Sequence, residues 1–230
     1  REPQIIADYL AAGGSAMLLV EPDFGVDEHL ATMLAKLGIS YGDGVIVDPD
    51  SHYFTDEQMV AVAHYGRHVV TRTLALSFFP GARPLNLVRA PGVTVTALAT
   101  TSPSSHVIDR RFSPAGAEDR ETFARPLLAA AEGRFDGRAE APPFRFIAAG
   151  DADFASNSFF PYMSNADLVL GMLAWLIHEE KAPAMKPPVE VLPMITLTGR
   201  DVQFIFTLTV ILLPGSVAAL GGLVWWRRRH

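Results

Sequence analysis

The sequence predicts an α/β domain, in which helices flank a sheet, followed by one C-terminal transmembrane helix. Two observations carry this prediction. The first fifty residues alternate between helical and strand-like patterns, which is typical of helices packed on a largely parallel sheet. Residues 202–226 contain no charged side chain, and three arginines follow them at once. That pattern indicates a membrane span with a basic stop.

The alternation begins with a helix. Residues 2–12 have a helical pattern that ends at Gly13-Gly14, and the apolar run 16–20 is typical of a buried strand. A parallel sheet normally has a strand before such a helix. We therefore infer that this is the C-terminal part of a longer chain, or that a partner upstream supplies the missing strand.

A second helix and a second strand follow. Asp27 can cap a helix that ends at Gly38, and residues 45–47 then read as a strand. The apolar positions of this helix recur at helical spacing: Leu30, Met33, Leu34 and Leu37.

The middle of the chain is less regular. The β-rich or apolar segments that predict further strands are residues 59–63, 85–88, 93–100 and 144–149. Residues 110–141 predict a mobile loop with one apolar piece at 126–131. Residues 165–179 form a helix pattern that is apolar almost all round, so we expect both of its faces to be covered.

These patterns predict four parts: an α/β domain at residues 1–180, a stiff proline-rich connector at 181–201, the span at 202–226 and a basic tail at 227–230. A helix of the span's length measures about 37 Å, enough to cross a hydrocarbon core of about 30 Å. The membrane anchor residues are Trp225 and Trp226, placed as an aromatic belt, and Arg227, Arg228 and Arg229. Because basic residues stay on the cytoplasmic side, we expect the tail in the cytoplasm and the domain on the extracytoplasmic side of the membrane.

Composition excludes several classes of function. The net charge of −6, with no basic stripe outside the tail, gives no indication of nucleic-acid binding. The chain has no cysteine, which excludes disulfides, thiolate metal sites and cysteine nucleophiles in it. It has neither a Walker loop nor a G-x-G-x-x-G motif, so we expect no ATPase or dinucleotide enzyme and no cofactor.

The sharpest motif is Gly150-Asp151-Ala152-Asp153-Phe154-Ala155-Ser156-Asn157, which follows a strand and precedes a helix. Ligands of open α/β sheets bind at such strand ends, and Asp151, Asp153 and Asn157 could hold a hard cation. The alternative, which we favour, is that the two carboxylates accept hydrogen bonds from loop N–H groups and the amide caps a turn.

A second motif runs from Thr100 to His106 and is rich in hydroxyl groups. It adds Thr101, Ser102 and Ser104 to the candidate ligand-binding residues. A hydrolase that uses Ser104 or Ser105 with His106 is the alternative, but adjacency in sequence does not gather a triad in space, and no G-x-S-x-G elbow is present. We favour hydroxyl groups that satisfy turn backbone.

A third candidate is the pair His64 and His68, spaced to chelate zinc on one helix face. Gly66 lies between them and no acidic third ligand is evident, so we expect no metal site there.

Several segments together resemble the GldG-type family, auxiliary components of ABC transport systems associated with gliding motility. The segments with the closest resemblance are 146–157, Asn165-Ala166-Asp167-Leu168, Ala174-Trp175-Leu176, 101–105, 43–49 and the Trp225-Trp226-Arg227-Arg228-Arg229 tail. Ala152 stands where the family usually has Ser, and Gly171 where it usually has Asn.

The resemblance implies a flavodoxin-like, class I glutamine-amidotransferase-like domain outside the cytoplasmic membrane of a bacterium. It implies an ABC permease and, through it, a cytoplasmic ATPase as partners, besides the lipid bilayer. No catalytic residues come with the family. We therefore expect a membrane-anchored, non-catalytic auxiliary component that binds substrate or the permease.

Overall fold

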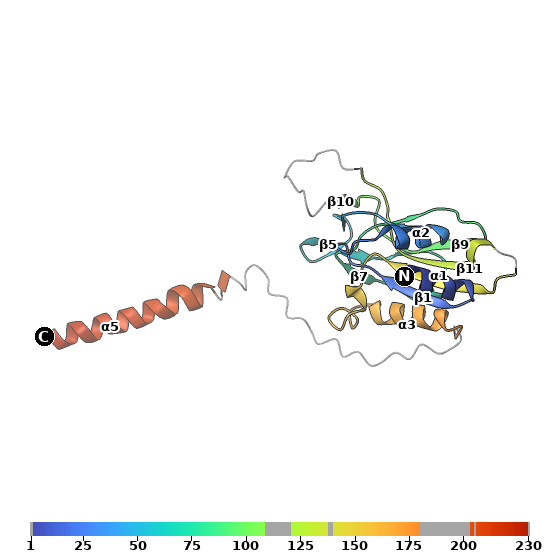
Figure 1. Ribbon diagram of the computed structural model, residues 1–230. Helices are drawn as coiled ribbons and strands as arrows, with labels where there is room; N and C mark the ends of the chain where they lie inside the picture. The colour runs from blue at the N-terminus through green and yellow to red at the C-terminus, as the bar shows by residue number, and fades with distance from the viewer. Residues whose placement is uncertain (1, 109–120, 138–139, 180–202, 205, 230) are drawn as a thin grey trace. The chain divides into compact units, whose positions relative to one another are not determined.

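The computed structural model describes residues 2–108, 121–137, 140–179, 203–204 and 206–229 (Figure 1). The chain divides into two compact units, Arg1–Val189 and Glu190–His230. The first unit is a mixed α/β domain built on one five-stranded sheet with helices on both faces.

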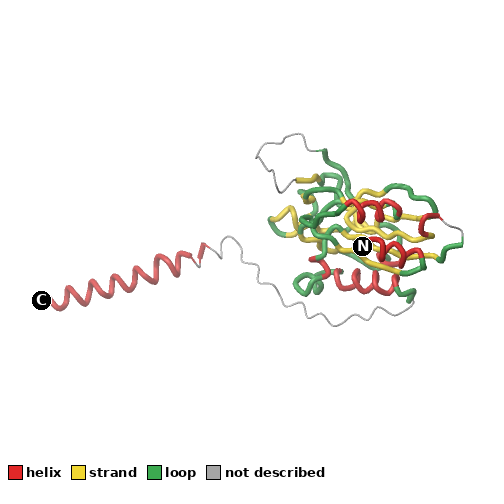
Figure 2. The backbone as a smooth tube through the Cα atoms, viewed as in Figure 1, coloured by secondary structure: helices red, strands yellow, loops and turns green. Residues whose placement is uncertain are grey.

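The central sheet has the strand order β1-β12-β11-β9-β6. Figure 2 shows the strands of the domain in yellow and its helices in red. Its strands are β1 (Ser15–Leu19), β6 (His64–Tyr65), β9 (Val93–Thr100), β11 (Pro126–Arg134) and β12 (Pro143–Ala149). β1 and β12 are parallel, whereas every other neighbouring pair is antiparallel. The prediction of a largely parallel sheet is therefore wrong. β11 and β12 are joined by residues 135–142, a connection too short for the crossover that parallel neighbours need.

Three small sheets surround the central one. They pair β10 (His106–Ile108) with β3 (Val45–Val47), β2 (Ile39–Tyr41) with β8 (Leu85–Leu87), and β5 (Asp56–Val62) with both β4 (His52–Tyr53) and β7 (Ser77–Pro80). All of these pairs are antiparallel.

The predicted elements of the N-terminal part are confirmed. Helix α1 covers Glu2–Ala11 and helix α2 covers Glu28–Lys36. The Asp27 side chain caps α2 by accepting a hydrogen bond of 2.8 Å from the backbone N–H of Leu30. The strands expected at 16–20, 45–47, 59–63, 85–88, 93–100 and 144–149 are also present, with boundaries shifted by a few residues at most.

Strand β11 corrects the prediction for residues 110–141. The sequence predicts an apolar piece within a mobile loop at residues 126–131, yet these residues form a strand between β12 and β9. Alanines at 129–131 are buried, because small side chains suit a central strand that is covered on both faces. Residues 110–120 and 138–139 of that predicted loop lie outside the described residues.

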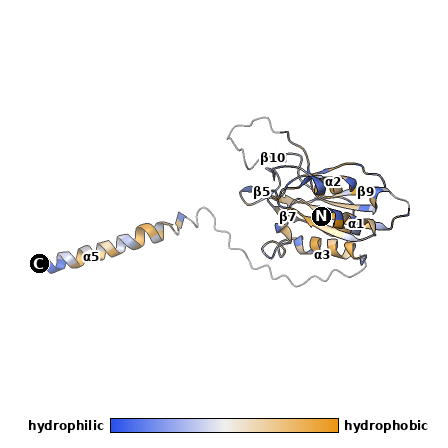
Figure 3. Cartoon of the chain, viewed as in Figure 1, coloured by the Kyte–Doolittle hydropathy of each residue, from blue (hydrophilic) through white to orange (hydrophobic). Residues whose placement is uncertain are grey.

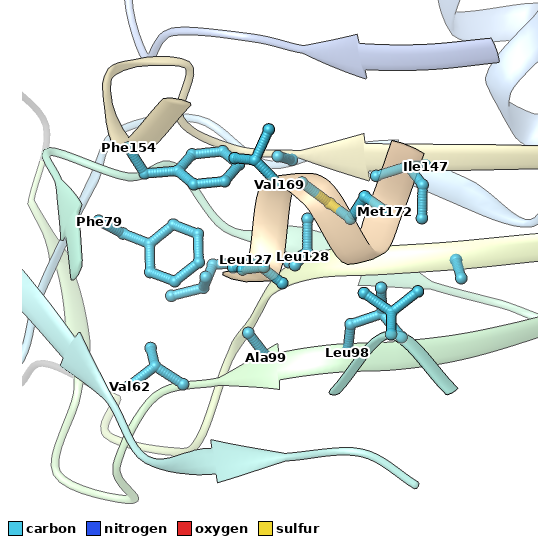
Figure 4. Packing of buried hydrophobic residues seen from close by; sticks show 14 of the residues in the cluster. Val62, Phe79, Leu98, Ala99, Leu127, Leu128, Ile147, Phe154, Val169 and Met172 are labelled. Atoms are coloured by element: carbon cyan, nitrogen blue, oxygen red, sulfur yellow. The ribbon is translucent and has the colours of Figure 1, made fainter. Parts of the chain in front are cut away.

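Two hydrophobic clusters cover the two faces of the sheet. Along β12, Phe144 and Phe146 pack with α1 and α2, whereas Ile147 and Ala149 pack on the opposite face with helix α3 (Asn165–Leu176). Alternation of period two places neighbouring residues of a strand on opposite faces. Figure 4 shows the α3 side, where Phe154 and Phe79 meet with ring centroids 4.9 Å apart.

Helix α3 has one buried face and one exposed face. Leu170 and Leu173 are 37% and 42% exposed, and Ile177, just after the helix, is 64% exposed, so the expectation that both faces are covered is wrong for the described chain. Figure 3 shows how hydrophobic this helix is. Asn165 fixes the start of the helix. Its amide accepts from the Phe78 N–H at 2.8 Å and donates to the Phe78 carbonyl at 3.1 Å.

The second unit contains a long apolar helix. A π-helical segment, η4 (Thr207–Leu212), continues into α5 (Leu213–Arg229). Together they give 23 residues, in which the most apolar stretch of 18 residues has a mean hydropathy of 1.9. The helix is long and apolar enough to cross a membrane. Pro214 has no N–H for an ordinary helical bond, and the widened turn before it is a known accommodation in apolar helices. The predicted connector at 181–201 lies outside the described residues.

Candidate functional site

Three strands of the central sheet end at the same edge. β1 runs parallel to β12, and β9 and β12 both run antiparallel to the β11 that separates them. The carboxyl ends of β1, β9 and β12 therefore point the same way, and loops leave them at Val20, Thr101 and Gly150. Such an edge is where open α/β sheets bind ligands.

The loop after β9 is held by a buried aspartate that sequence reasoning missed. Asp48, directly after β3, is fully buried. Its carboxylate accepts hydrogen bonds from the N–H of Ser102 at 2.8 Å and from the Ser102 hydroxyl at 2.5 Å. It also accepts from the N–H groups of Asp50 and Ser51 at 3.3 and 3.1 Å. Both carboxylate oxygens are thus satisfied by the chain itself.

The hydroxyl groups of the same loop bond to one another. Thr101 and Ser105 are joined at 2.6 Å, and Ser105 donates to the Phe123 carbonyl at 2.8 Å. Ser104 shares a bond of 2.7 Å with the Ser102 hydroxyl. The hydroxyls of Ser104 and Ser105 therefore help to hold the loop. The hydrolase alternative requires one of these same hydroxyls as its nucleophile.

Gly150 lies against the backbone of Arg83. The Arg83 N–H donates to the Gly150 carbonyl at 2.7 Å, while the Gly150 N–H donates to the Leu127 carbonyl at 2.9 Å. A Cβ atom on residue 150 would lie 1.9 Å from the Arg83 carbonyl oxygen. Only glycine fits this approach, which fixes the direction in which the chain enters the aspartate loop.

Three carboxylates gather beside Gly150. Glu21, from the loop after β1, accepts hydrogen bonds at its Oε1 from the N–H groups of Ala152 at 2.7 Å and Asp153 at 3.2 Å. Oxygen atoms of Glu21, Asp151 and Asp153 all lie within 4.8 Å of one another. Asp151 is fully buried, whereas Asp153 is exposed.

The Asp151 carboxyl is strongly perturbed. Its Oδ1 accepts from the Asp153 N–H at 2.8 Å, but its Oδ2 is buried without a hydrogen-bond partner. Burial raises the pKa of Asp151 to about 8, the backbone N–H groups of Asp153 and Phe154 oppose the rise, and the negative charges of Glu21 and Asp153 add to it. An unpaired buried carboxyl of this kind marks a candidate functional position.

A buried arginine lies close to this cluster. The Arg83 guanidinium donates to the carbonyls of Gly42 and Phe24, both at 2.9 Å, and contacts the exposed Asp43 carboxylate at 3.6 Å. It borders a cavity of about 340 Å³ that Phe24 and Tyr41 also line. Burial raises the pKa of the Tyr41 hydroxyl and lowers the pKa of Arg83. Backbone carbonyls already occupy much of this cation's donor capacity.

Comparison with known proteins identifies the family. Residues 1–172 match ABC_transp_aux, a family described as an ABC-type uncharacterized transport system. The chain belongs to this family. It is accordingly an auxiliary component of an ABC-type transport system.

The fold of this ABC_transp_aux member is also similar to a solved structure, the "mmIFT52 N-terminal domain". The match has a TM-score of 0.53 and 15% sequence identity, and it covers 76% of this chain and 70% of the other. At that identity the likeness concerns the fold alone. No curated protein sequence matches the chain.

The structure places the predicted site residues in two separate loops. Thr101 and Gly150 both bond to the start of β11, at the Arg125 and Leu127 carbonyls, so they flank that strand. Two strand spacings separate such positions, about 9–10 Å. Asp151 and Asp153 come together, and Asn157 is exposed farther along the same loop. His64 lies on β6, and His68 precedes the 3₁₀ turn η1 (Val69–Thr71), so the pair does not share a helix face.

Sequence reasoning missed Glu21, Asp48 and Arg83. Glu21 and Asp48 each come one or two residues after a short apolar strand, which is the same positional signal that singled out Asp151. Arg83 had no such signal, because the carbonyl groups that hold its guanidinium, at Gly42 and Phe24, lie far from it in the sequence.

Proposed function

We propose that this chain is a membrane-anchored, non-catalytic component of its ABC-type transport system, with the α/β domain on the extracytoplasmic side. The family match carries the transport role. The apolar helix Thr207–Arg229 with its terminal arginines supports the anchor and its orientation. The lipid bilayer of the bacterial inner membrane, a permease and, through it, a cytoplasmic ATPase are then its partners.

Three finer proposals follow from the sequence. The chain belongs to the GldG-type group, with a link to gliding motility. Its parts are the domain 1–180, the connector 181–201, the span 202–226 and the tail 227–230. Its architecture is related to the flavodoxin-like and amidotransferase-like folds. The helices on both sheet faces and the parallel β1–β12 pair support this relation, whereas the antiparallel pairs of β11 and β6 depart from a doubly wound parallel sheet.

The domain's role is binding of the permease or of the transported substrate. The loop after β9 supports a structural role for Thr101, Ser102 and Ser104, because their hydroxyls are used within the domain. The loop after β12 is the better candidate for ligand binding, because a ligand there could pair with the unsatisfied buried oxygen of Asp151.

Co-purification tests the partner assignment. The full chain, carrying a tag, is isolated from its native membrane in mild detergent, and a polytopic permease together with an ATPase is expected to co-purify. A variant in which Leu220 and Leu223 of the apolar helix are changed to Arg serves as the control for anchoring, since charges in a span are costly. Recovery of the unchanged chain as a monomer would contradict the proposal.

Protease accessibility tests the orientation. In intact spheroplasts, protease added outside should degrade the α/β domain and leave an epitope placed after His230 protected. A domain that resists digestion until the membrane is opened overturns the extracytoplasmic placement.

A further inference from the structure

The carboxylate cluster beside β12 has the composition of a cation site. Glu21, Asp151 and Asp153 supply only oxygen atoms, the ligands that hard divalent cations take. Two different strand ends contribute, since Glu21 follows β1 and the aspartates follow β12. Hydrogen bonds from Ala152 and Asp153 to Glu21 Oε1 hold these two strand ends together and leave Oε2 for a ligand.

An independent observation points to a missing ligand. Asp151 is fully buried, and its Oδ2 has no hydrogen-bond partner. Buried side-chain oxygens are nearly always paired, so this atom calls for a partner that the chain does not supply. In the described part of the chain, three buried side-chain polar atoms lack a partner, and a second of them, Ser156 Oγ, belongs to the same loop.

The spacing of the cluster can accommodate a divalent cation, and the kind of ligand favours calcium. Three points that all lie within 4.8 Å of one another have a common centre no more than about 2.8 Å from each. Ca²⁺–oxygen distances are about 2.3–2.6 Å and Mg²⁺–oxygen distances about 2.0–2.1 Å. Both ions fit within this limit. Ca²⁺ tolerates irregular arrangements of carboxylates, whereas Mg²⁺ demands near-ideal octahedral geometry and is usually held by one or two carboxylates, so three carboxylates from two loops favour Ca²⁺.

We propose that Glu21, Asp151 and Asp153 form a calcium site that joins the ends of β1 and β12. The cation supplies the positive charge that three neighbouring carboxylates lack, and water or backbone carbonyls complete its coordination. The site goes beyond the transport role and does not depend on it, because it concerns the isolated chain.

Calorimetric titration of the full chain in detergent tests the site. After treatment with a chelator, the chain is titrated with CaCl₂ and, in a separate arm, with MgCl₂. We expect one Ca²⁺ per chain, with a dissociation constant of about 10⁻⁴–10⁻³ M, as in extracellular modules, and at least tenfold weaker Mg²⁺ binding. Equal affinity for Mg²⁺ would overturn the assignment of the site to calcium.

Matched variants localise the binding. Asp151→Asn and Asp153→Asn are each expected to weaken Ca²⁺ binding at least tenfold, and the exposed position of Asp153 keeps its variant folded. Asp23→Asn removes another exposed carboxylate only two residues from Glu21, and it should bind Ca²⁺ as the unchanged chain does. Absence of binding at 10-fold above the expected range, or unchanged affinity in both cluster variants, refutes the calcium site while leaving co-purification of the permease unaffected.

Discussion

Two buried aspartates, Asp48 and Asp151, lie at the ends of strands in this domain, and their surroundings are opposite. Asp48 receives hydrogen bonds from Ser102, Asp50 and Ser51 on both of its oxygens. Asp151 receives one at Oδ1, leaves Oδ2 unpaired, and lies beside two further carboxylates. Both are fully buried, so burial alone does not tell a structural carboxylate from a candidate ligand. The number of donors aimed at each one does.

The largest expected effect is on the pH dependence of stability, which the Asp151 carboxyl should change. The pKa of Asp151 is raised from 3.8 to about 8 in the folded chain. Between these values the unfolded chain has lost this proton and the folded chain retains it, so stability falls as pH rises. Relative to Asp151→Asn, the unchanged chain should lose up to about 5 kcal/mol from pH 4 to pH 8.

Thermal unfolding of the full chain in detergent with a chelator, followed from pH 4 to pH 9, measures this loss. Asp23→Asn, at an exposed position outside the cluster, is the matched control and should follow the unchanged chain closely. If the stability of the unchanged chain and that of Asp151→Asn changed with pH in the same way, Asp151 would be ionised in the folded chain without cost. Its surroundings would then not differ from those of Asp48 in the way described.

Removal of the Asp48 carboxylate should lower the stability of the domain, whereas removal of the Asp151 carboxylate should raise it at neutral pH. Asp48→Ala leaves the buried N–H and hydroxyl of Ser102 without an acceptor. We expect a loss of about 4 kcal/mol in the free energy of unfolding, measured by denaturant titration at pH 7. Asp50→Ala, at an exposed neighbouring position, should change it by less than about 0.5 kcal/mol. A small effect at Asp48 would mean that water replaces the carboxylate.

The approach of Gly150 to Arg83 positions the aspartate loop, and a methyl group there should disturb it. Gly150→Ala places a Cβ 1.9 Å from the Arg83 carbonyl oxygen, so we expect a loss of about 3 kcal/mol. Gly25→Ala is the matched control, since nothing lies within 4 Å of its new methyl group. Equal melting temperatures for the two variants would contradict the tight packing of this strand end.

The smallest effect on stability is expected at Ser104, which contacts Asp48 only through the Ser102 hydroxyl. Ser104→Ala removes only the bond to the Ser102 hydroxyl, at a half-buried position, and should cost less than about 1 kcal/mol. Ser105→Ala removes two bonds from a buried hydroxyl and should cost about 1–2 kcal/mol in the same denaturant titration. If Ser104→Ala were the more damaging variant, its hydroxyl would have a role beyond holding the loop.

Local patterns determined much of this molecule. The helical spacing of Leu30, Met33 and Leu34 with the Asp27 cap, the alternation at 93–100 and the uncharged C-terminal run each depend on residues near in sequence. Residues local to Asp151 also marked its loop as a candidate site. Such features are readable because capping, periodicity and hydropathy act over a few residues.

Tertiary structure alone decided the rest. Strand β11 was missed because its alanine run and flanking glycine carry a weak strand signal, and only pairing with β9 and β12 stabilises it. The same pairing made the sheet mixed and brought Glu21 to Asp151, 130 residues later in the chain. Whether a buried carboxylate is satisfied, as Asp48 is, or left unpaired, as Asp151 is, depends on which distant N–H and O–H groups the fold delivers to it. No local pattern encodes that delivery.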